Sequence, residues 1–158
     1  MVADMSYYTV SNVVESWEML RKIPDFQEKA GVELFKMYFD LEPRAATVFS
    51  FGKGEALDDE FYKSPRLLRH ASHYINMVDR AVNLLGPDIE ILTDILMELG
   101  EQHYKFGVEA SYYPPMGHAL IKTLEKFLGD DFTPEMKNSW LETYQALAYD
   151  MIRSKHRK

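Results

Sequence analysis

Apolar residues recur every three or four positions through most of this chain, which is the spacing of helices that bury one face. No stretch alternates as a strand would. The first helix is predicted from residue 9 or 11 to residue 23, where Pro24 ends it. The next is predicted over residues 25–41, and Asp25 with Glu28 three residues later resembles a capping box at its start.

Prolines and glycines divide the rest of the chain into further helical pieces. Residues 1–8 are expected to form a loosely held lead-in, and residues 52–63, with two glycines and four acids, the most mobile segment, with one helical turn. The pattern therefore predicts one all-α domain of about eight helices over residues 1–158. Its other helices are expected over residues 43–48, 64–86, 89–107, 114–129 and 133–152.

Two histidines are predicted on apolar helix faces. On the helix over residues 64–86, His70 lies beside the apolar stripe, one turn before Tyr74. His73 falls on the other side, among arginines that form the solvated face. The stripe consists of Leu67, Ala71, Tyr74, Val78, Val82 and Leu85.

The following helix carries His103 in the same kind of position. Glutamates, an aspartate and a lysine occupy its opposite, solvated face. His70 and His103 are therefore both expected to point into one apolar interior, whereas His118 aligns with Lys122 and Glu125 on an exposed side. The apolar face that leads to His103 and beyond it comprises Leu92, Leu96, Leu99 and Phe106.

The histidine pair changes how each histidine is interpreted. A single histidine on an apolar face is most often a hydrogen-bonded core residue. Two imidazoles that face each other across an apolar slot, without a cysteine or a carboxylate cluster beside them, suit the axial positions of a haem. A zinc ion would require three or four ligands.

Composition narrows the function classes. With 46% hydrophobic and 27% charged residues the chain is an ordinary globular protein, and its 13% aromatic residues suit either a cofactor pocket or a large aromatic core. A net charge of −7 argues against a nucleic-acid-binding surface, and the short basic end over residues 153–158 is typical of a solvated helix terminus. No run could span a bilayer and no signal-peptide pattern is present, so a cytoplasmic protein is the simplest expectation; the absence of cysteine permits a reducing compartment.

Taken together, these features resemble the globin family over nearly the whole chain, from Trp17 to Ile152. The resemblance rests on Trp17, the LFKMYFDLEP segment, Phe49 six residues after Pro43, RLLRH ending at His70, LGEQHYKFGV around His103, and the segment from GHALIKTLEKF to the NSW tripeptide. It is greatest to neuroglobin-like and single-domain bacterial haem globins rather than to the shortened globins. The resemblance implies a three-over-three helical sandwich around haem b, iron protoporphyrin IX.

The resemblance also implies individual roles. His103 would be the proximal iron ligand, with its second ring nitrogen donating to the Leu99 carbonyl, and His70 the distal histidine. Phe49 would stack on the haem and Phe35 would face the distal pocket. The proximal side would be packed by Leu99, Val108 and Tyr113, where Leu99 and Val108 are equally interpretable as ordinary core.

Several roles on the distal side stay open. His70 can donate a hydrogen bond to bound oxygen or occupy the sixth iron position itself, and Phe35 favours the second because it has no hydroxyl to hold a ligand. Tyr74 stands where globins generally have a compact aliphatic residue, so it can crowd the site, hydrogen-bond to a ligand or turn into the adjoining core. His73 can pair with a haem propionate or simply face solvent.

Three functions are compatible with the sequence. The first is reversible binding of oxygen, NO or CO, as carrier, scavenger or sensor. The second is a haem enzyme, an NO dioxygenase or nitrite reductase, which would need a separate reductase because the chain carries no flavin or nicotinamide domain; no residue is assigned a catalytic role. The third is a helical interaction module without haem. The surface pattern gives no signal for an oligomeric state.

Overall fold

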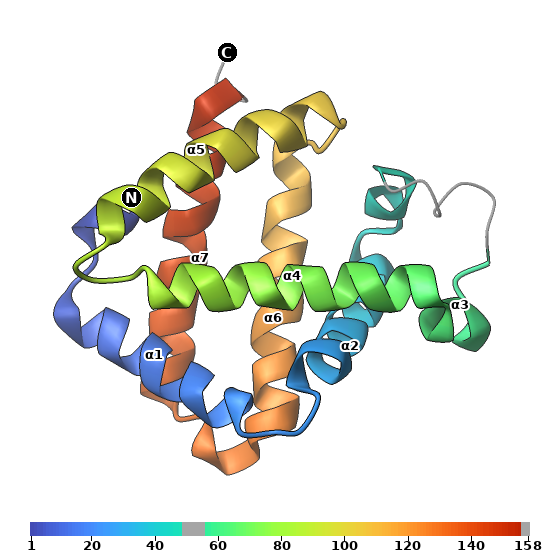
Figure 1. The fold of residues 1–158 in the computed structure, drawn as a ribbon, viewed down its shortest axis with the longest axis horizontal. Coiled ribbons are helices and arrows are strands. Elements are labelled where there is room, and N and C mark those ends of the chain that lie inside the picture. Colours follow the sequence, from blue (N-terminus) through green and yellow to red (C-terminus); the bar gives the residue numbers. More distant parts are fainter. Residues whose placement is uncertain (49–55, 156–158) are drawn as a thin grey trace.

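The computed structural model describes residues 1–48 and 56–155, and throughout these ranges the regular elements are all helices, which confirms the all-α prediction (Figure 1). Each predicted helix is found, with ends that differ by a few residues. The α-helices are α1 (Tyr7–Arg21), α2 (Phe26–Leu41), α3 (Asp59–Lys63), α4 (Pro65–Asn83), α5 (Ile89–Lys105), α6 (Tyr113–Leu128) and α7 (Pro134–Lys155), and the 3-10 helices are η1 (Val2–Asp4), η2 (Pro43–Val48), η3 (Ala110–Tyr112) and η4 (Gly129–Asp131).

The long helices form two crossed layers of three. In Figure 1, α1, α4 and α5 lie in front of α2, α6 and α7, and α4 runs across the layer behind it. The main contacts join the layers: α4 packs on α2, whereas α1 and α5 pack on α7. The predicted three-over-three arrangement is thus present. Large side chains that are almost fully buried fill the space between the layers, among them Trp17, Trp140, Phe35 and Phe39.

A glycine sets the distance between α2 and α4. A Cβ atom at Gly31 would lie 2.6 Å from the Ala71 carbonyl oxygen and 2.9 Å from the Ala71 Cβ. The backbones of the two helices therefore approach more closely than any side chain at position 31 would allow. This crossing fixes where the residues one turn further along α2 meet α4.

A polar connection also joins α1 to α4. The Trp17 indole N–H donates to Asp79 Oδ1 over 2.8 Å, and Arg21 Nε donates to the same oxygen over 2.6 Å. Trp17 itself is fully buried, so the carboxylate satisfies an indole nitrogen that water does not reach. This connection holds the second half of α4 against α1.

The first residues are ordered, contrary to the expected loose lead-in over residues 1–8. Val2 is 2% exposed, and its backbone N–H donates to the buried Asp150 carboxylate over 3.0 Å. The Ser6 side chain accepts from the Thr9 N–H, which starts α1 earlier than predicted, at Tyr7. A partner 148 residues away in sequence thus fixes a segment that shows no helical periodicity of its own.

The capping box predicted at the start of α2 is not formed. Asp25 has a left-handed backbone conformation with φ of 58°, and its side chain makes no capping hydrogen bond. Asp tolerates this conformation better than most residues, and the tight turn between α1 and α2 uses it. The cap predicted for α4 is confirmed, because Ser64 Oγ accepts from the Leu67 N–H.

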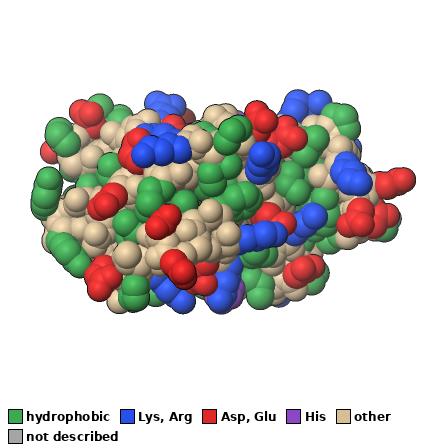
Figure 2. Space-filling model, turned by 90° about the horizontal axis from the view of Figure 1, so that it is seen from below, with side chains coloured by type: hydrophobic (Ala, Val, Ile, Leu, Met, Phe, Trp, Pro, Cys, Tyr) green, Lys and Arg blue, Asp and Glu red, His purple; other side chains and the backbone are tan. Residues whose placement is uncertain are grey.

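The predicted helical turn within residues 52–63 corresponds to α3, although residues 52–55 lie outside the described ranges, so the mobility of this segment stays a prediction. In the described part of the chain, no helix combines the length and apolarity needed to cross a membrane. On the face shown in Figure 2, acidic and basic side chains alternate rather than gather into one large patch of a single sign.

Candidate functional site

The inner face of α4 carries the first predicted site histidine. Leu67, Ala71 and Ile75 are completely buried, and His70 is half-buried beside them. His73 is exposed, as predicted from its place among the arginines. Tyr74, predicted on the apolar stripe, is only half-buried. The fully buried position beside it belongs to Ile75, which the predicted stripe did not include.

Phe35 of α2 contacts both aromatic residues on this face of α4. Its ring centroid lies 5.1 Å from that of His70 and 5.6 Å from that of Tyr74, with the tyrosine ring nearly perpendicular at 81°. Phe35 reaches this position because it is one turn beyond Gly31, where α2 and α4 are closest. The structure therefore brings Phe35, His70 and Tyr74 into one aromatic cluster.

Burial keeps the His70 imidazole neutral. Removal from water, with a smaller contribution from the neighbouring His73, lowers the pKa of His70 from 6.5 to about 4. At neutral pH the ring is therefore uncharged and retains a nitrogen lone pair. A neutral imidazole is the form that binds iron or other metals.

His103 lies at the end of α5, with its ring orientation fixed by the preceding turn. Its Nδ1 is 2.8 Å from the Leu99 carbonyl oxygen, which confirms the expected hydrogen bond between them. A carbonyl oxygen can only accept, so Nδ1 carries the proton and Nε2 is the basic nitrogen of the neutral ring. This is the arrangement that commonly orients a metal-binding histidine.

Residues after α5 surround His103. The Val108 N–H donates to the His103 carbonyl oxygen over 2.9 Å, and half-buried Val108 packs on the core. The Tyr113 ring lies 6.3 Å from the His103 ring, and burial raises the pKa of Tyr113 to about 12. The structure therefore groups Leu99, Val108 and Tyr113 near His103.

Two phenylalanines that the sequence analysis singled out, Phe106 and Phe49, are not among the described residues of the predicted site. Phe106, predicted on the buried stripe, is 72% exposed, because α5 ends at Lys105 and Gly107 turns the chain with φ of 90°. Phe49 lies outside the described residues, so its predicted stacking role stays a prediction.

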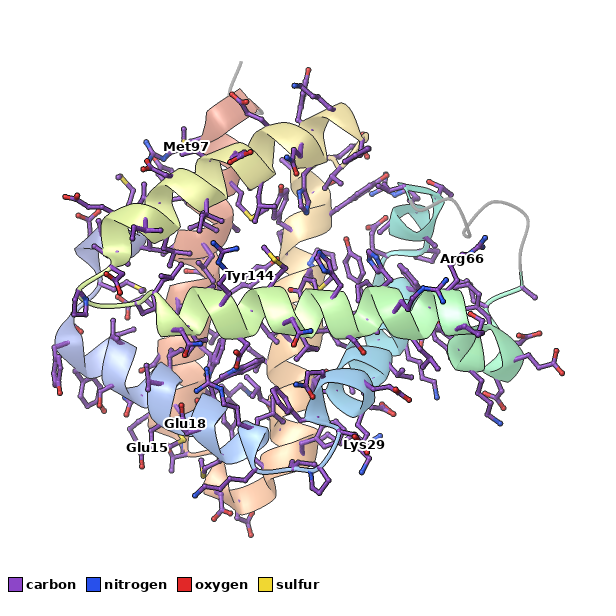
Figure 3. All side chains as sticks on the ribbon, in the orientation of Figure 1. Glu15, Glu18, Lys29, Arg66, Met97 and Tyr144 are labelled. Atoms are coloured by element: carbon purple, nitrogen blue, oxygen red, sulfur yellow. The ribbon has the colours of Figure 1, made fainter. Side chains whose placement is uncertain are left out.

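Two tyrosines that the sequence placed only in apolar stripes also support the site. The Tyr38 hydroxyl donates to the Tyr112 carbonyl over 3.0 Å, and the Tyr144 hydroxyl to the Tyr113 carbonyl over 2.6 Å. In Figure 3 the labelled Tyr144 lies in the interior between α4 and α5. A tyrosine on a buried helix face needs a hydrogen-bond partner for its hydroxyl. The positions of Tyr38 and Tyr144 on apolar stripes could therefore have predicted these hydrogen bonds.

The number of side chains that could act as metal ligands distinguishes between kinds of metal site. Within the described ranges, no three histidine, aspartate or glutamate side chains gather as ligands for a bare ion. Instead, α4 and α5 each present one imidazole, and the ring of His103 is held by a backbone carbonyl. One or two histidines in aromatic surroundings fit haem iron, whereas zinc would require a larger set.

An open groove of about 570 Å³ lies elsewhere, between α2, α3 and α6. Its rim is charged, and Lys126 and Glu33 form an ion pair of 2.8 Å there. Neither His70 nor His103 lines it. The groove is therefore separate from the histidine site.

Comparison with known proteins supports the assignment made from the geometry. The family model described as Globin matches residues 32–151. Neuroglobin of Danio rerio is 31% identical over 141 residues, covering 88% of this chain and 85% of that protein. Neuroglobin of Dissostichus mawsoni is 30% identical over 138 residues, covering 86% of this chain and 83% of that protein.

Solved structures show the same fold at lower identity. A hexacoordinated haem protein from an anhydrobiotic tardigrade has a TM-score of 0.84 at 21% identity, covering 97% of this chain and 96% of that chain. A hexa-coordinate haemoglobin of Drosophila melanogaster has a TM-score of 0.80 at 18% identity, covering 94% of both chains.

Proposed function

Because the chain belongs to the globin family, we propose that it binds haem b between α4 and α5 and reversibly binds oxygen, NO or CO in competition with His70. The observation that carries this proposal is the Leu99 carbonyl bond to His103 Nδ1. That bond leaves Nε2 as the basic nitrogen of a ring at the end of α5, while α4 presents a second neutral imidazole. Haem supplies an iron that can take one protein ligand on each face or exchange one of them for a gas molecule.

We assign His103 as the proximal ligand. Its ring is oriented before any cofactor binds, since the hydrogen bond to Leu99 lies within one turn of the same helix. Leu99, Val108 and Tyr113 pack this side, and we propose that they keep water from the nitrogen. A dry environment strengthens the bond between a neutral imidazole and a metal.

On the distal side we propose that His70 is the internal sixth ligand. Phe35 contacts the His70 ring but offers no hydroxyl to a bound gas, and Tyr74 closes the same cluster one turn further along α4. The tardigrade and Drosophila proteins of the same fold are described as hexacoordinated and hexa-coordinate, which agrees with this assignment. We further propose that Phe49 stacks on the haem and that exposed His73 lies near a propionate.

Internal ligation lowers the apparent affinity for gas. If the His70-bound form is favoured by about 10²-fold, external ligands bind roughly 10²-fold more weakly, because only the open fraction can accept them. Gas binding then depends on movement of His70 out of the sixth position. This behaviour suits a sensor or scavenger better than a simple oxygen store.

A cytoplasmic location is part of the same proposal, since a chain without cysteines is compatible with a reducing compartment.

The visible spectrum of the reduced, oxygen-free protein tests the proposal, with haem content measured on the same sample. Sharp, split bands indicate a six-coordinate iron and support His70 as the internal ligand. A single broad band indicates a five-coordinate iron, which would leave His70 as a hydrogen-bond donor and favour oxygen storage or delivery. A purified protein that takes up no haem would refute the haem proposal itself.

Substitution of each histidine separates the two ligand assignments. His103→Ala should reduce haem retention severely, and a variant with full haem and an unchanged spectrum would contradict the proximal role. His70→Leu should retain haem but capture CO faster, since the internal competitor is gone. His118→Leu, on the exposed side of α6, is the matched control and should change neither property.

A further inference from the structure

Helix α4 carries His70 in its first half, and a polar junction holds its second half against α1. In this junction Arg21 of α1 reaches two residues that lie one turn apart on α4. Its Nε donates to Asp79 Oδ1 over 2.6 Å, and its Nη2 donates to Asn83 Oδ1 over 2.6 Å. Because the guanidinium is planar and rigid, two contacts at this spacing fix both the position of α4 along its axis and its rotation about that axis.

The surroundings of Arg21 and Asp79 hold the junction in one geometry. The Nη1 of Arg21 pairs with Glu18, which lies one turn earlier on α1. The buried Trp17 indole N–H donates to the same oxygen of Asp79 that Arg21 contacts. The Arg21 and Asp79 side chains are only 24% and 28% exposed, so water competes for this pair less than for an ion pair on the open surface.

The first half of α4 is held differently, at its crossing with α2. There the backbone of Gly31 lies so close to Ala71 that α4 has no space to move towards α2. Ala71 directly follows His70 in the sequence. A reorientation of α4 that keeps this crossing must therefore turn the helix about a point beside His70.

The helix would transmit such a turn to the junction. It runs from Pro65 to Asn83 without an interior glycine or proline, so its two halves move together. Asp79 lies eight residues beyond Ala71, which is about 12 Å along the axis. A turn of about 5° would therefore move Asp79 by about 1 Å. That movement would lengthen its 2.6 Å contact with Arg21 beyond hydrogen-bonding distance.

We propose that Arg21 and Asp79 are positioning residues for His70, because their junction resists the turn of α4 that would take the imidazole out of the sixth iron position. This inference rests on the function proposed above. An intact junction favours the His70-bound form, and a loosened junction increases the open fraction and raises the apparent gas affinity by the same factor. The affinity for gas is then set partly by α1, a helix that carries neither site histidine.

CO capture by the reduced, haem-loaded protein tests the proposal in two backgrounds. Arg21→Met keeps the aliphatic stem but removes the donors, and Asp79→Asn keeps an acceptor for Trp17 but removes the charge that faces Arg21. Each should speed CO capture several-fold and shift the reduced spectrum from split towards broad bands. In the His70→Leu background neither should change capture, because the competitor through which they act is absent. An equal change in both backgrounds, or no change in either, would overturn the proposal.

Arg80→Met is the matched control for the removal of charge. Arg80 is the exposed neighbour of Asp79 on α4 and takes no part in the junction. Its substitution should change neither CO capture nor the reduced spectrum. An effect as large as that of Arg21→Met would assign the change to the net charge of the protein rather than to the junction, and would overturn the proposal.

Chemical modification of the haem-free chain supplies a measurement that needs no iron. Diethyl pyrocarbonate modifies accessible neutral imidazoles, and the exposed His118 provides an internal reference on the same chain. The ratio of His70 to His118 modification, measured by peptide mass spectrometry, should rise several-fold in both junction variants but not in the control. A ratio that stays the same in all variants would overturn the proposal.

The haem function and the positioning role fail in different ways. A wild-type protein that takes up no haem, or whose reduced spectrum shows a single broad band, would refute the proposed function. The modification ratio would still report whether the junction holds His70. Conversely, split bands that persist unchanged in both junction variants would retain the haem function and exclude the positioning role.

Discussion

Gly31→Ala would test whether the crossing of α2 and α4 is as tight as the structure indicates. The added Cβ would lie 2.6 Å from the Ala71 carbonyl oxygen, whereas ordinary contact begins at 3.4 Å. The helices would have to separate by about 0.8 Å at this point, the difference between those two distances. Because the atoms met are backbone, no side-chain rotation relieves the contact.

Two opposing effects set the magnitude of this change. Overpacking a well-packed core costs about 1–3 kcal/mol, and a contact with backbone belongs at the upper end. Alanine in place of glycine within a helix returns roughly 0.5–1 kcal/mol. We therefore expect a net loss of about 1–2 kcal/mol in the free energy of unfolding, which corresponds to a fall in Tm of about 2–8 °C for a chain of this size.

Urea unfolding of the haem-free chain, followed by far-ultraviolet circular dichroism, measures this loss without a contribution from haem release. Lys29→Ala on the solvent side of α2 is the control and should change stability by less than about 0.5 kcal/mol. Adding Ala71→Gly to Gly31→Ala should rescue little, since the carbonyl carbon and oxygen at position 71 remain. A Gly31→Ala protein as stable as the wild type would refute the reasoning.

Two further predictions concern Asp79 and His70. Asp79→Ala should lower the free energy of unfolding by about 1–3 kcal/mol because it leaves the buried Trp17 indole N–H without an acceptor. Asp79→Asn retains an acceptor and should lower it less. Equal urea midpoints for the two variants would contradict this. The pKa of His70 is about 4 in the folded chain and 6.5 when unperturbed, so the unfolded state takes up the proton first as pH falls. The stability of the haem-free wild type should therefore fall from pH 6.5 towards pH 4 more steeply than that of His70→Leu, and parallel curves would exclude this role for His70.

Much of the architecture follows from local pattern. The three-or-four spacing of apolar residues predicted the long helices, because an amphipathic helix must bury one face wherever it packs. The carbonyl partner of His103 was also predictable, since Leu99 lies one turn earlier on the same helix. The exposure of His73 followed from its neighbours Arg66 and Arg69 in the same way.

The expectations that failed depend on residues distant in sequence. Residues 1–8 lack helical periodicity, but the buried Asp150 carboxylate fixes Val2. Asp25 is a residue type common at helix N-caps, but here it adopts a left-handed conformation in the short connection between α1 and α2. Phe106 has the sequence spacing of the buried stripe, but α5 ends one residue before it, at Lys105. The spacing therefore no longer places Phe106 on the buried face.

The sequence by itself determined that this chain forms amphipathic helices with one histidine on each of two apolar faces, since these properties depend on spacing along a single helix. Only the tertiary structure decided which side chains meet. The contact of Phe35 with His70 results from the close approach of Gly31 to Ala71, and the hydrogen bond from Tyr144 to the Tyr113 carbonyl joins residues 31 positions apart. Contacts between helices depend on backbone distances that no local pattern encodes, because they are set by the packing of all the side chains between them.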